Sequence, residues 1–267
     1  MPTPIRELEC FVFDMDGTIN LGETLIPGAL ELITALKKRD TKFFFFTNNS
    51  SRSPIDYVKK LERLGFPGIN LSHIMTSGDV MIHYLKTHFA APKIYLAGTP
   101  ALHAQFLEAG ITLLEADART ADAVVIGFDT TFSFEKADTA CRLIAAGVPF
   151  LATNMDRVCP LEGGAFLPDC GSMCAMLEHA TGVAPKFTGK PFGETVEYIL
   201  AAAGAAPEKT AMVGDRLYTD IATAVNGNIT GIAVLSGEIS QKDIDESEIH
   251  PDYVFDSVAG ILSELQA

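Results

Sequence analysis

Two carboxylates stand two residues apart at the end of an apolar segment, in residues 11–18 (FVFDMDGT). If this segment is a buried strand, Asp14 and Asp16 lie where ligands bind in open α/β sheets, at the carboxyl end of a strand. Such a pair suits a division of labour, with one carboxylate as nucleophile and the other as general acid and base. A strand followed by a plain Asp-Gly turn is the structural alternative, and this motif alone leaves it open.

A second polar group follows the phenylalanine-rich segment 42–46. Thr47 and Asn48 come directly after it, followed by Ser50 and Ser51. A hydroxyl and free backbone N–H groups at a strand end can hold phosphate oxygens. Helix capping explains the serines equally well, so this group is a weak signal by itself.

The last two groups lie in the C-terminal third of the chain. Lys190 stands between a glycine and a proline, which is a rigid local frame for a cation, although most lysines are solvated surface groups. Asp215 and Asp220 follow another apolar segment, on a tight loop that is expected to open a helix. Oxygen ligands of this kind favour a hard cation, and Mg²⁺ usually keeps several waters beside one or two carboxylates.

The elements that must position these groups alternate between strand-like and helix-like segments, which favours an α/β fold with a parallel sheet. In the outer thirds of the chain we predict strands at 10–14, 42–47, 74–76, 210–213, 231–234 and 252–255, and helices at 27–39 and 53–64. Residues 1–79 and 188–267 are therefore expected to form one discontinuous, Rossmann-like core.

The middle of the chain has its own alternation. We predict strands at 93–97, 123–126 and 149–153, and helices at 101–109, 134–146 and 172–179. Residues 80–187 are therefore expected to form an inserted α/β cap domain. A length of 267 residues agrees with two domains.

Composition excludes several classes of protein. A formal net charge of −14 argues against nucleic acid as a partner. The apolar runs are too short to span a membrane, and the N-terminal residues lack the pattern of a signal peptide, so we expect a cytoplasmic protein. Five cysteines without framework spacing argue against a disulfide scaffold, and Cys170 and Cys174 fit buried thiols better than a metal pair.

Taken in order along the chain, the four groups resemble the motifs of the haloacid dehalogenase-like superfamily of phosphatases. The matching segments are Asp14-x-Asp16-Gly-Thr, Thr47-Asn48, Lys190 and Gly-Asp215-x4-Asp220. The resemblance covers essentially the whole chain. The inserted domain, with Asn154 and Asp156 inside it, resembles the caps of the subfamily that contains p-nitrophenylphosphatases, nucleotidases and pyridoxal or glycolate phosphatases.

This resemblance implies a Mg²⁺-dependent hydrolase of small phosphate monoesters. Asp14 would attack phosphorus and become an aspartyl phosphate. Asp16 would protonate the leaving oxygen and then activate water, while its backbone carbonyl binds the metal. Asp215 would complete the protein ligands, and Asp220 would orient metal-bound water.

The same resemblance assigns residues to the phosphate site. It also shows two positions at which this sequence differs from the pattern of the subfamily. Thr47 and the backbone of Asn48 would hold the phosphoryl group, and Lys190 would offset its charge. Asn20 stands where an aromatic or apolar residue is expected in this subfamily. The loop 168–171 (PDCG) stands where the cap usually has Pro-Gly-x-Gly.

The cap is expected to act as a lid and to choose the substrate, because the core motifs bind only phosphoryl and metal. Asn154, Asp156 and Asp169 are the candidate specificity residues, with a plain turn and helix start as the alternative. Assembly into a homo-oligomer through the cap is a further hypothesis. A catalytically silent binding protein and a phosphotransferase remain as alternatives to a phosphatase, whereas an ion pump would need membrane spans that the sequence lacks.

Overall fold

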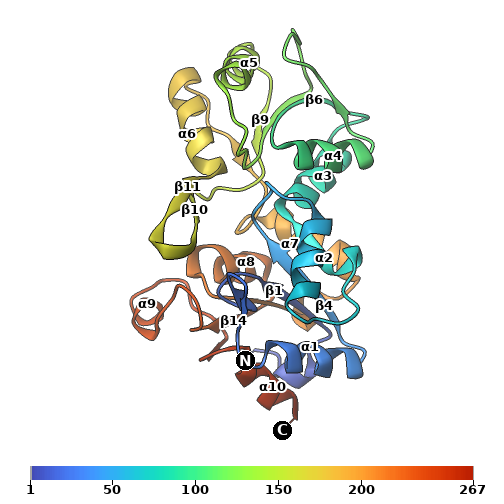
Figure 1. Cartoon of the computed structure of the whole chain (residues 1–267), viewed down its shortest axis with the longest axis vertical. Helices are drawn as coiled ribbons and strands as arrows, with labels where there is room; N and C mark the ends of the chain where they lie inside the picture. The colour runs from blue at the N-terminus through green and yellow to red at the C-terminus, as the bar shows by residue number, and fades with distance from the viewer. Residues whose placement is uncertain (1, 267) are drawn as a thin grey trace. The chain divides into compact units, whose positions relative to one another are not determined.

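The computed structural model describes residues 2–266, and the chain divides into two compact units that each contain a parallel sheet (Figure 1). The first unit comprises Met1–Thr47, Pro54–Met75 and Lys190–Ala267, and the second comprises Asn48–Ser53 and Thr76–Gly189. The α/β class predicted from the sequence, with a parallel-sheet core and a second sheet in an inserted segment, is confirmed.

The sheet of the first unit has six strands in the order β15-β14-β13-β1-β4-β5. Their bounds are β1 Cys10–Asp14, β4 Lys42–Thr47, β5 Ile74–Thr76, β13 Thr210–Gly214, β14 Thr230–Val234 and β15 Tyr253–Phe255. Strand β1 is paired in parallel with β13 on one side and β4 on the other. The ends of β13, β1 and β4 therefore lie next to one another, and three of the four sequence motifs lie at the ends of these strands.

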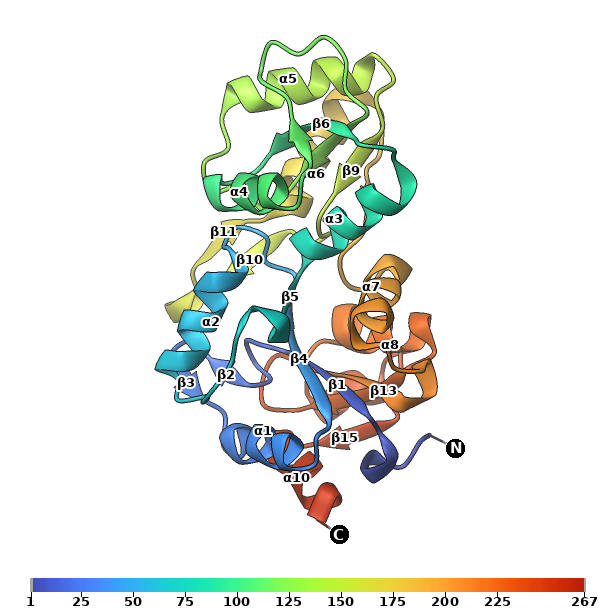
Figure 2. The same ribbon diagram turned by 90° about the vertical axis from the view of Figure 1, so that its right-hand side faces the viewer.

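Helices cover both faces of this sheet, because alternate strand residues point to opposite faces and both sets are apolar (Figure 2). One face packs against α1 (Ala29–Lys38), α2 (Pro54–Arg63) and α10 (Val258–Gln266), with Phe13 and Phe45 at the centre of this layer. Helices α7 (Gly193–Ala203) and α8 (Ala222–Gly227) belong to the other face and pack against each other.

The second unit is built around a five-stranded parallel sheet in the order β12-β9-β8-β6-β7. Its strands are β6 Lys93–Ala97, β7 Thr112–Leu113, β8 Ala123–Ile126, β9 Phe150–Ala152 and β12 Lys186–Phe187. Helices α3 (Ser77–His88) and α4 (Pro100–Glu108) share one apolar cluster with the sheet. Helices α5 (Phe134–Ala145) and α6 (Cys170–Thr181) share the other.

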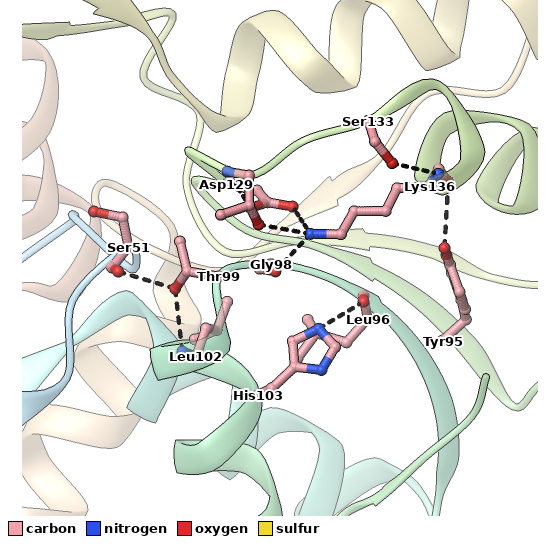
Figure 3. A network of polar contacts seen from close by, with 11 residues as sticks. Ser51, Tyr95, Leu96, Gly98, Thr99, Leu102, His103, Asp129, Ser133 and Lys136 are labelled. Carbon is pink, nitrogen blue, oxygen red and sulfur yellow. Dashed lines mark hydrogen bonds and ion pairs between the residues drawn. The ribbon is translucent and has the colours of Figure 1, made fainter. Parts of the chain in front are cut away.

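A polar network ties the ends of β6 and β8 together inside this unit (Figure 3). The buried carboxylate of Asp129 pairs with Lys136 at 2.5 Å, and the same ammonium donates to the carbonyl of Gly98 at 3.0 Å. Thr99 caps the start of α4 and donates its hydroxyl to the carbonyl of Ser51. The charges of this network are paired within it, so its role is to hold the loops after the strands.

The remaining elements are short. They are β2 (Asn20–Leu21), β3 (Thr24–Leu25), the hairpin β10 (Val158–Pro160) and β11 (Phe166–Pro168), α9 (Gln241–Asp245), the 3₁₀ turns η1 (Ile5–Glu7), η2 (Leu71–His73), η3 (Glu162–Gly164) and η4 (Pro207–Lys209), and the π-helical turn η5 (Leu217–Ile221). The sequence did not predict these strands, because two or three residues are too few to show a periodic pattern.

The structure also bears on two expectations drawn from the composition, which concern the cysteines and membrane-spanning segments. Cys170 and Cys174 are buried free thiols with their sulfurs 4.0 Å apart, as expected for core residues. None of the helices described within residues 2–266 combines the length and the apolar character that crossing a bilayer requires.

Candidate active site

Three carboxylates gather at the carboxyl edge of the first unit's sheet. Asp14 is the last residue of β1, and Asp215 follows the adjacent strand β13. Asp220 lies in the π-helical turn η5. One oxygen from each of the three side chains lies within 4.8 Å of the others. All three are among the site residues that the sequence analysis singled out.

The π-helical turn brings Asp220 back toward the strand end. The amide of Ile221 donates to the carbonyl of Arg216 at 3.2 Å, which is the five-residue bond of a π turn. The amide of Arg216 in turn donates to Asp220 Oδ2 at 3.1 Å. Gly214 allows this approach, because a Cβ at that position would overlap the Asp220 carboxylate. The sequence predicted a tight loop here, but the π register could not be read from it.

Lys190 is the cation of the cluster. Its side chain is buried, and its Nζ donates to Asp14 Oδ1 and, at 2.6 Å, to Asp220 Oδ1. Burial alone would lower the pKa of this ammonium, but the charges of Asp14 and Asp220 outweigh burial and raise the pKa above its usual value. Lys190 therefore stays protonated, and it links the nucleophile candidate to the buried carboxylate.

Asp215 is held from two sides. Its Oδ2 accepts the amide of Glu238 at 2.8 Å, and its Oδ1 faces the hydroxyl of Thr18 at 3.3 Å. Gly17 and Gly237 both lie against this carboxylate, and a Cβ on either would overlap it. Burial, followed by the charge of Asp14, raises the pKa of Asp215 to about 6.

This donor set fits a magnesium ion. The ammonium of Lys190 pairs with Asp14 and Asp220, and the guanidinium of Arg216 interacts electrostatically with Asp14 and Asp215. Three carboxylates thus face two cations, and a divalent cation would offset the excess negative charge. All the ligand atoms are oxygens, the type that Mg²⁺ prefers. Asp220 is buried and accepts the Lys190 ammonium, whereas Asp215 accepts the neutral amide of Glu238 and Asp14 is partly exposed, so Asp14 and Asp215 are the better placed ligands.

Asp16 has a different environment from the three clustered carboxylates. Its side chain is 59% exposed, and it accepts hydrogen bonds from Lys60 and Asn20. The sequence analysis did not single out Lys60. The sequence did contain a pattern that could have indicated a buried lysine. Lys60 lies on the apolar face of α2, between the buried residues Tyr57 and Leu61.

The predicted phosphate ligands belong to different units. Thr47 ends β4, beside the end of β1, and is half-buried. Asn48 begins the first segment of the second unit. Within that unit its side-chain amide donates to Asp156 Oδ2 at 2.8 Å, and its carbonyl accepts the hydroxyl of Ser77 at 2.6 Å. The side chain of Asn48 is therefore engaged with the inserted segment.

The three candidate specificity residues form one hydrogen-bonded chain within the second unit. The amide of Asn154 donates to Asp156 Oδ2 at 2.9 Å and to Asp169 Oδ1 at 3.0 Å. Asp169 is buried and caps the N-terminus of α6 through the amide of Cys170. Asp156 is the least buried of the three. A ligand could therefore contact Asp156, whose position is fixed by its hydrogen bond with Asn154.

Comparison with known proteins agrees with this geometry. The family described as haloacid dehalogenase-like hydrolase matches residues 11–112, and a related hydrolase family matches residues 187–261. The glycerol-3-phosphate phosphatase of Homo sapiens is 33% identical, over 98% of this chain and 92% of that protein.

Two solved structures share the fold across nearly the whole chain. The 4-nitrophenylphosphatase of Thermotoga maritima has a TM-score of 0.93 and 37% identity, over 99% of this chain and 100% of that one. The glycerol phosphate phosphatase of Mycobacterium tuberculosis, solved in complex with magnesium, has a TM-score of 0.89 and 30% identity, over 98% of this chain and 78% of that one.

The glycines around Asp215 generate a test of the metal site. We expect Gly237→Ala to weaken Mg²⁺ binding by about 10- to 100-fold, as changes to residues that support a metal ligand typically do, because the new Cβ displaces the Asp215 carboxylate. Isothermal titration with Mg²⁺ measures the effect. Gly193→Ala is the matched control, since a Cβ there meets nothing within 4 Å. Unchanged affinity in Gly237→Ala would contradict the placement of Asp215 as a ligand.

Proposed function

The chain belongs to the haloacid dehalogenase-like hydrolases, in their p-nitrophenylphosphatase-like subfamily, and we propose that this phosphatase works through an aspartyl phosphate on Asp14. One observation supports this choice of nucleophile above the others. Of the three clustered carboxylates, Asp14 has a side chain that is 16% exposed, whereas those of Asp215 and Asp220 are buried. Asp14 is therefore the member that a phosphate ester can reach.

The proposed reaction has two steps. In the first, a carboxylate oxygen of Asp14 forms a bond to phosphorus while the bond from phosphorus to the leaving oxygen breaks, and Asp16 gives its proton to that oxygen. In the second, water attacks phosphorus, Asp16 takes the proton from the water, and the bond between phosphorus and Asp14 breaks. Inorganic phosphate leaves, Asp14 is again a carboxylate, and Asp16 again carries the proton with which it began the cycle.

The other residues of the cluster lower the electrostatic barrier. Asp14 and Asp215, with the backbone carbonyl of Asp16, would hold Mg²⁺, which supplies positive charge against the transferring phosphoryl group. Lys190 neutralises part of the negative charge on Asp14, which otherwise repels the dianionic substrate. Asp220 holds Lys190 in place and would orient water at the metal. Thr47 and the backbone of Asn48 would bind the phosphoryl oxygens.

Substitution of the two catalytic aspartates should separate their roles. We expect Asp14→Asn to abolish turnover, because an amide is a poor nucleophile at phosphorus. We expect Asp16→Asn to slow phosphorylation by an alkyl phosphate by about 10²–10⁴-fold, the typical contribution of a general acid. The loss with p-nitrophenyl phosphate should be smaller, because that leaving group needs little protonation. Single-turnover kinetics measures both.

The exposed Asp245 on α9 provides the control, since Asp245→Asn alters a carboxylate outside the cluster and should leave both rates unchanged. A rate for Asp14→Asn above a tenth of the wild-type value would contradict the covalent mechanism. Equal slowing of alkyl and p-nitrophenyl esters by Asp16→Asn would contradict its role as the acid.

For the substrate, we propose a small alkyl phosphate with a hydroxylated leaving group. Two of the similar proteins are named as phosphatases of glycerol phosphate. Inside the second unit, Asp156 and Asn154 form a polar cluster that would suit hydroxyl groups. A hydrolysis screen with and without Mg²⁺ should include glycerol phosphate beside nucleotides, sugar phosphates, phosphoglycolate and pyridoxal phosphate.

The proposed role of residues 80–187 as a specificity cap makes a further prediction. We expect Asp156→Ala to change the ranking of substrates by kcat/KM across this screen while leaving Mg²⁺ affinity unchanged, because Asp156 is the least buried residue of the chain of hydrogen bonds. Asp169→Ala should change the ranking too, and should also destabilise the protein by about 0.5–2 kcal/mol through the lost helix cap. An unchanged ranking in both variants would show that these residues do not select the substrate.

We also propose that the protein forms a homo-oligomer through this unit. The hairpin β10–β11 exposes apolar side chains, with Val158 45% and Phe166 65% exposed. We expect Phe166→Ser to lower the molar mass measured by light scattering after gel filtration. Leu71→Ser, at an exposed apolar position of the first unit, is the control. A monomeric wild-type protein at micromolar concentration would rule out the proposal.

A further inference from the structure

The carboxylate of Asp16 is fixed by two residues that the reaction scheme does not otherwise use. The ammonium of Lys60 lies 3.1 Å from Oδ1 and 3.2 Å from Oδ2, so it bridges both oxygens. The amide of Asn20 donates to Oδ1 at 2.6 Å. Lys60 comes from α2 and Asn20 from β2, so two separate elements converge on one side chain.

Lys60 is buried although it is charged. Its side chain is 10% exposed, whereas that of its partner Asp16 is 59% exposed. A buried ammonium is strongly unfavourable unless it is paired, so the position of Lys60 indicates a specific use of the pair. Arg63, one turn further along α2, shows the contrast, because it pairs at 3.5 Å with Glu23 while both side chains are mostly exposed.

Asn20 is equally constrained. It is fully buried, and its Nδ2 also donates to the carbonyl of Gly22 at 2.9 Å. The carbonyl of Asn20 accepts the amide of Gly17 at 2.7 Å, which closes the turn that carries Asp16. These bonds fix the direction of the side-chain amide. Asn20 was noted in the sequence as a departure from the expected apolar residue, and the structure places its polar group on Asp16.

We propose that Lys60 and Asn20 are positioning residues that hold the Asp16 carboxylate in place for proton transfer to and from the substrate, an inference that rests on the proposed role of Asp16. A largely exposed carboxylate would otherwise sample several rotamers. Oδ1 accepts from both residues, whereas Oδ2 accepts from Lys60 alone. Oδ2 is therefore the oxygen that exchanges the proton with the substrate.

The test compares leaving groups in single turnover. We expect Lys60→Met, which keeps most of the apolar stem, to slow phosphorylation by an alkyl phosphate by about 10- to 100-fold, the scale of a misplaced catalytic group. The effect on p-nitrophenyl phosphate should be smaller, and KM should change little. Lys60→Arg, which keeps a cation within reach of both oxygens, should restore most of the rate. Arg63→Met is the matched control on the same helix and should leave the rates unchanged.

A double-mutant cycle then tests whether Lys60 acts through Asp16. In the Asp16→Asn background, Lys60→Met should cause no further loss with the alkyl ester. Full additivity, or equal slowing of both esters by Lys60→Met, would overturn the proposal while leaving the role of Asp16 intact. If Asp16→Asn itself shows no dependence on the leaving group, the role of Asp16 is wrong, and the role of Lys60 fails with it.

Asn20→Leu provides an independent variant of similar size. It should slow the alkyl ester in the same direction, because it removes the second donor to Oδ1. Thermal unfolding and Mg²⁺ titration of each variant establish that the fold and the metal site are retained. If Lys60→Met does not fold, the result with Asn20→Leu decides, and wild-type rates in Asn20→Leu would then overturn the proposal.

Discussion

Electrostatic repulsion within the cluster of Asp14, Asp215 and Asp220 is the constraint on which the rest of the site depends. One ammonium, Lys190, is shared by two of these carboxylates, and the third is held by a backbone amide and faces a hydroxyl. Like charges at this separation repel strongly where water is excluded. The fold must therefore hold them together by other means, and it does so with backbone N–H donors and with glycines that leave room for the carboxylates. The same repulsion creates the demand for a divalent cation.

The environments of the four aspartates differ in a way that agrees with their proposed roles. Asp215 and Asp220 are buried and fixed by backbone donors, which suits groups that hold a metal ion or a lysine. Asp14 is partly exposed beside them, and Asp16 is mostly exposed and bound by a lysine from another element. Burial and hydrogen bonding thus suit residues of one chemical type to the different functions that we propose for them, as in other enzymes with paired carboxylates.

Much of this arrangement could be predicted from the sequence, because the signals are local. Strands β1 and β4 begin and end at the predicted residues, since each is a continuous apolar segment bounded by polar residues. The motifs that contain Asp14, Thr47 and Asp215 lie at the ends of such strands, so the rule for parallel sheets brings them to one edge. What the sequence did not predict depends on long-range contacts. Lys60 meets Asp16 from 44 residues away, and Asn48 meets Asp156 from 108 residues away.

Asp169 has a structural role as a helix cap, and it also contacts the residues that we propose to select the substrate. From the sequence, Asp169 could be either a specificity residue or the first residue of a helix. In the structure it is the N-cap of α6. The same oxygen that caps the helix also accepts the amide of Asn154, whose other contact is Asp156. Any motion of the start of α6 would therefore reach Asp156 through two hydrogen bonds. A helix cap of this kind gives the half-buried carboxylate of Asp156 a rigid support, which the proposed selection among similar leaving groups would require.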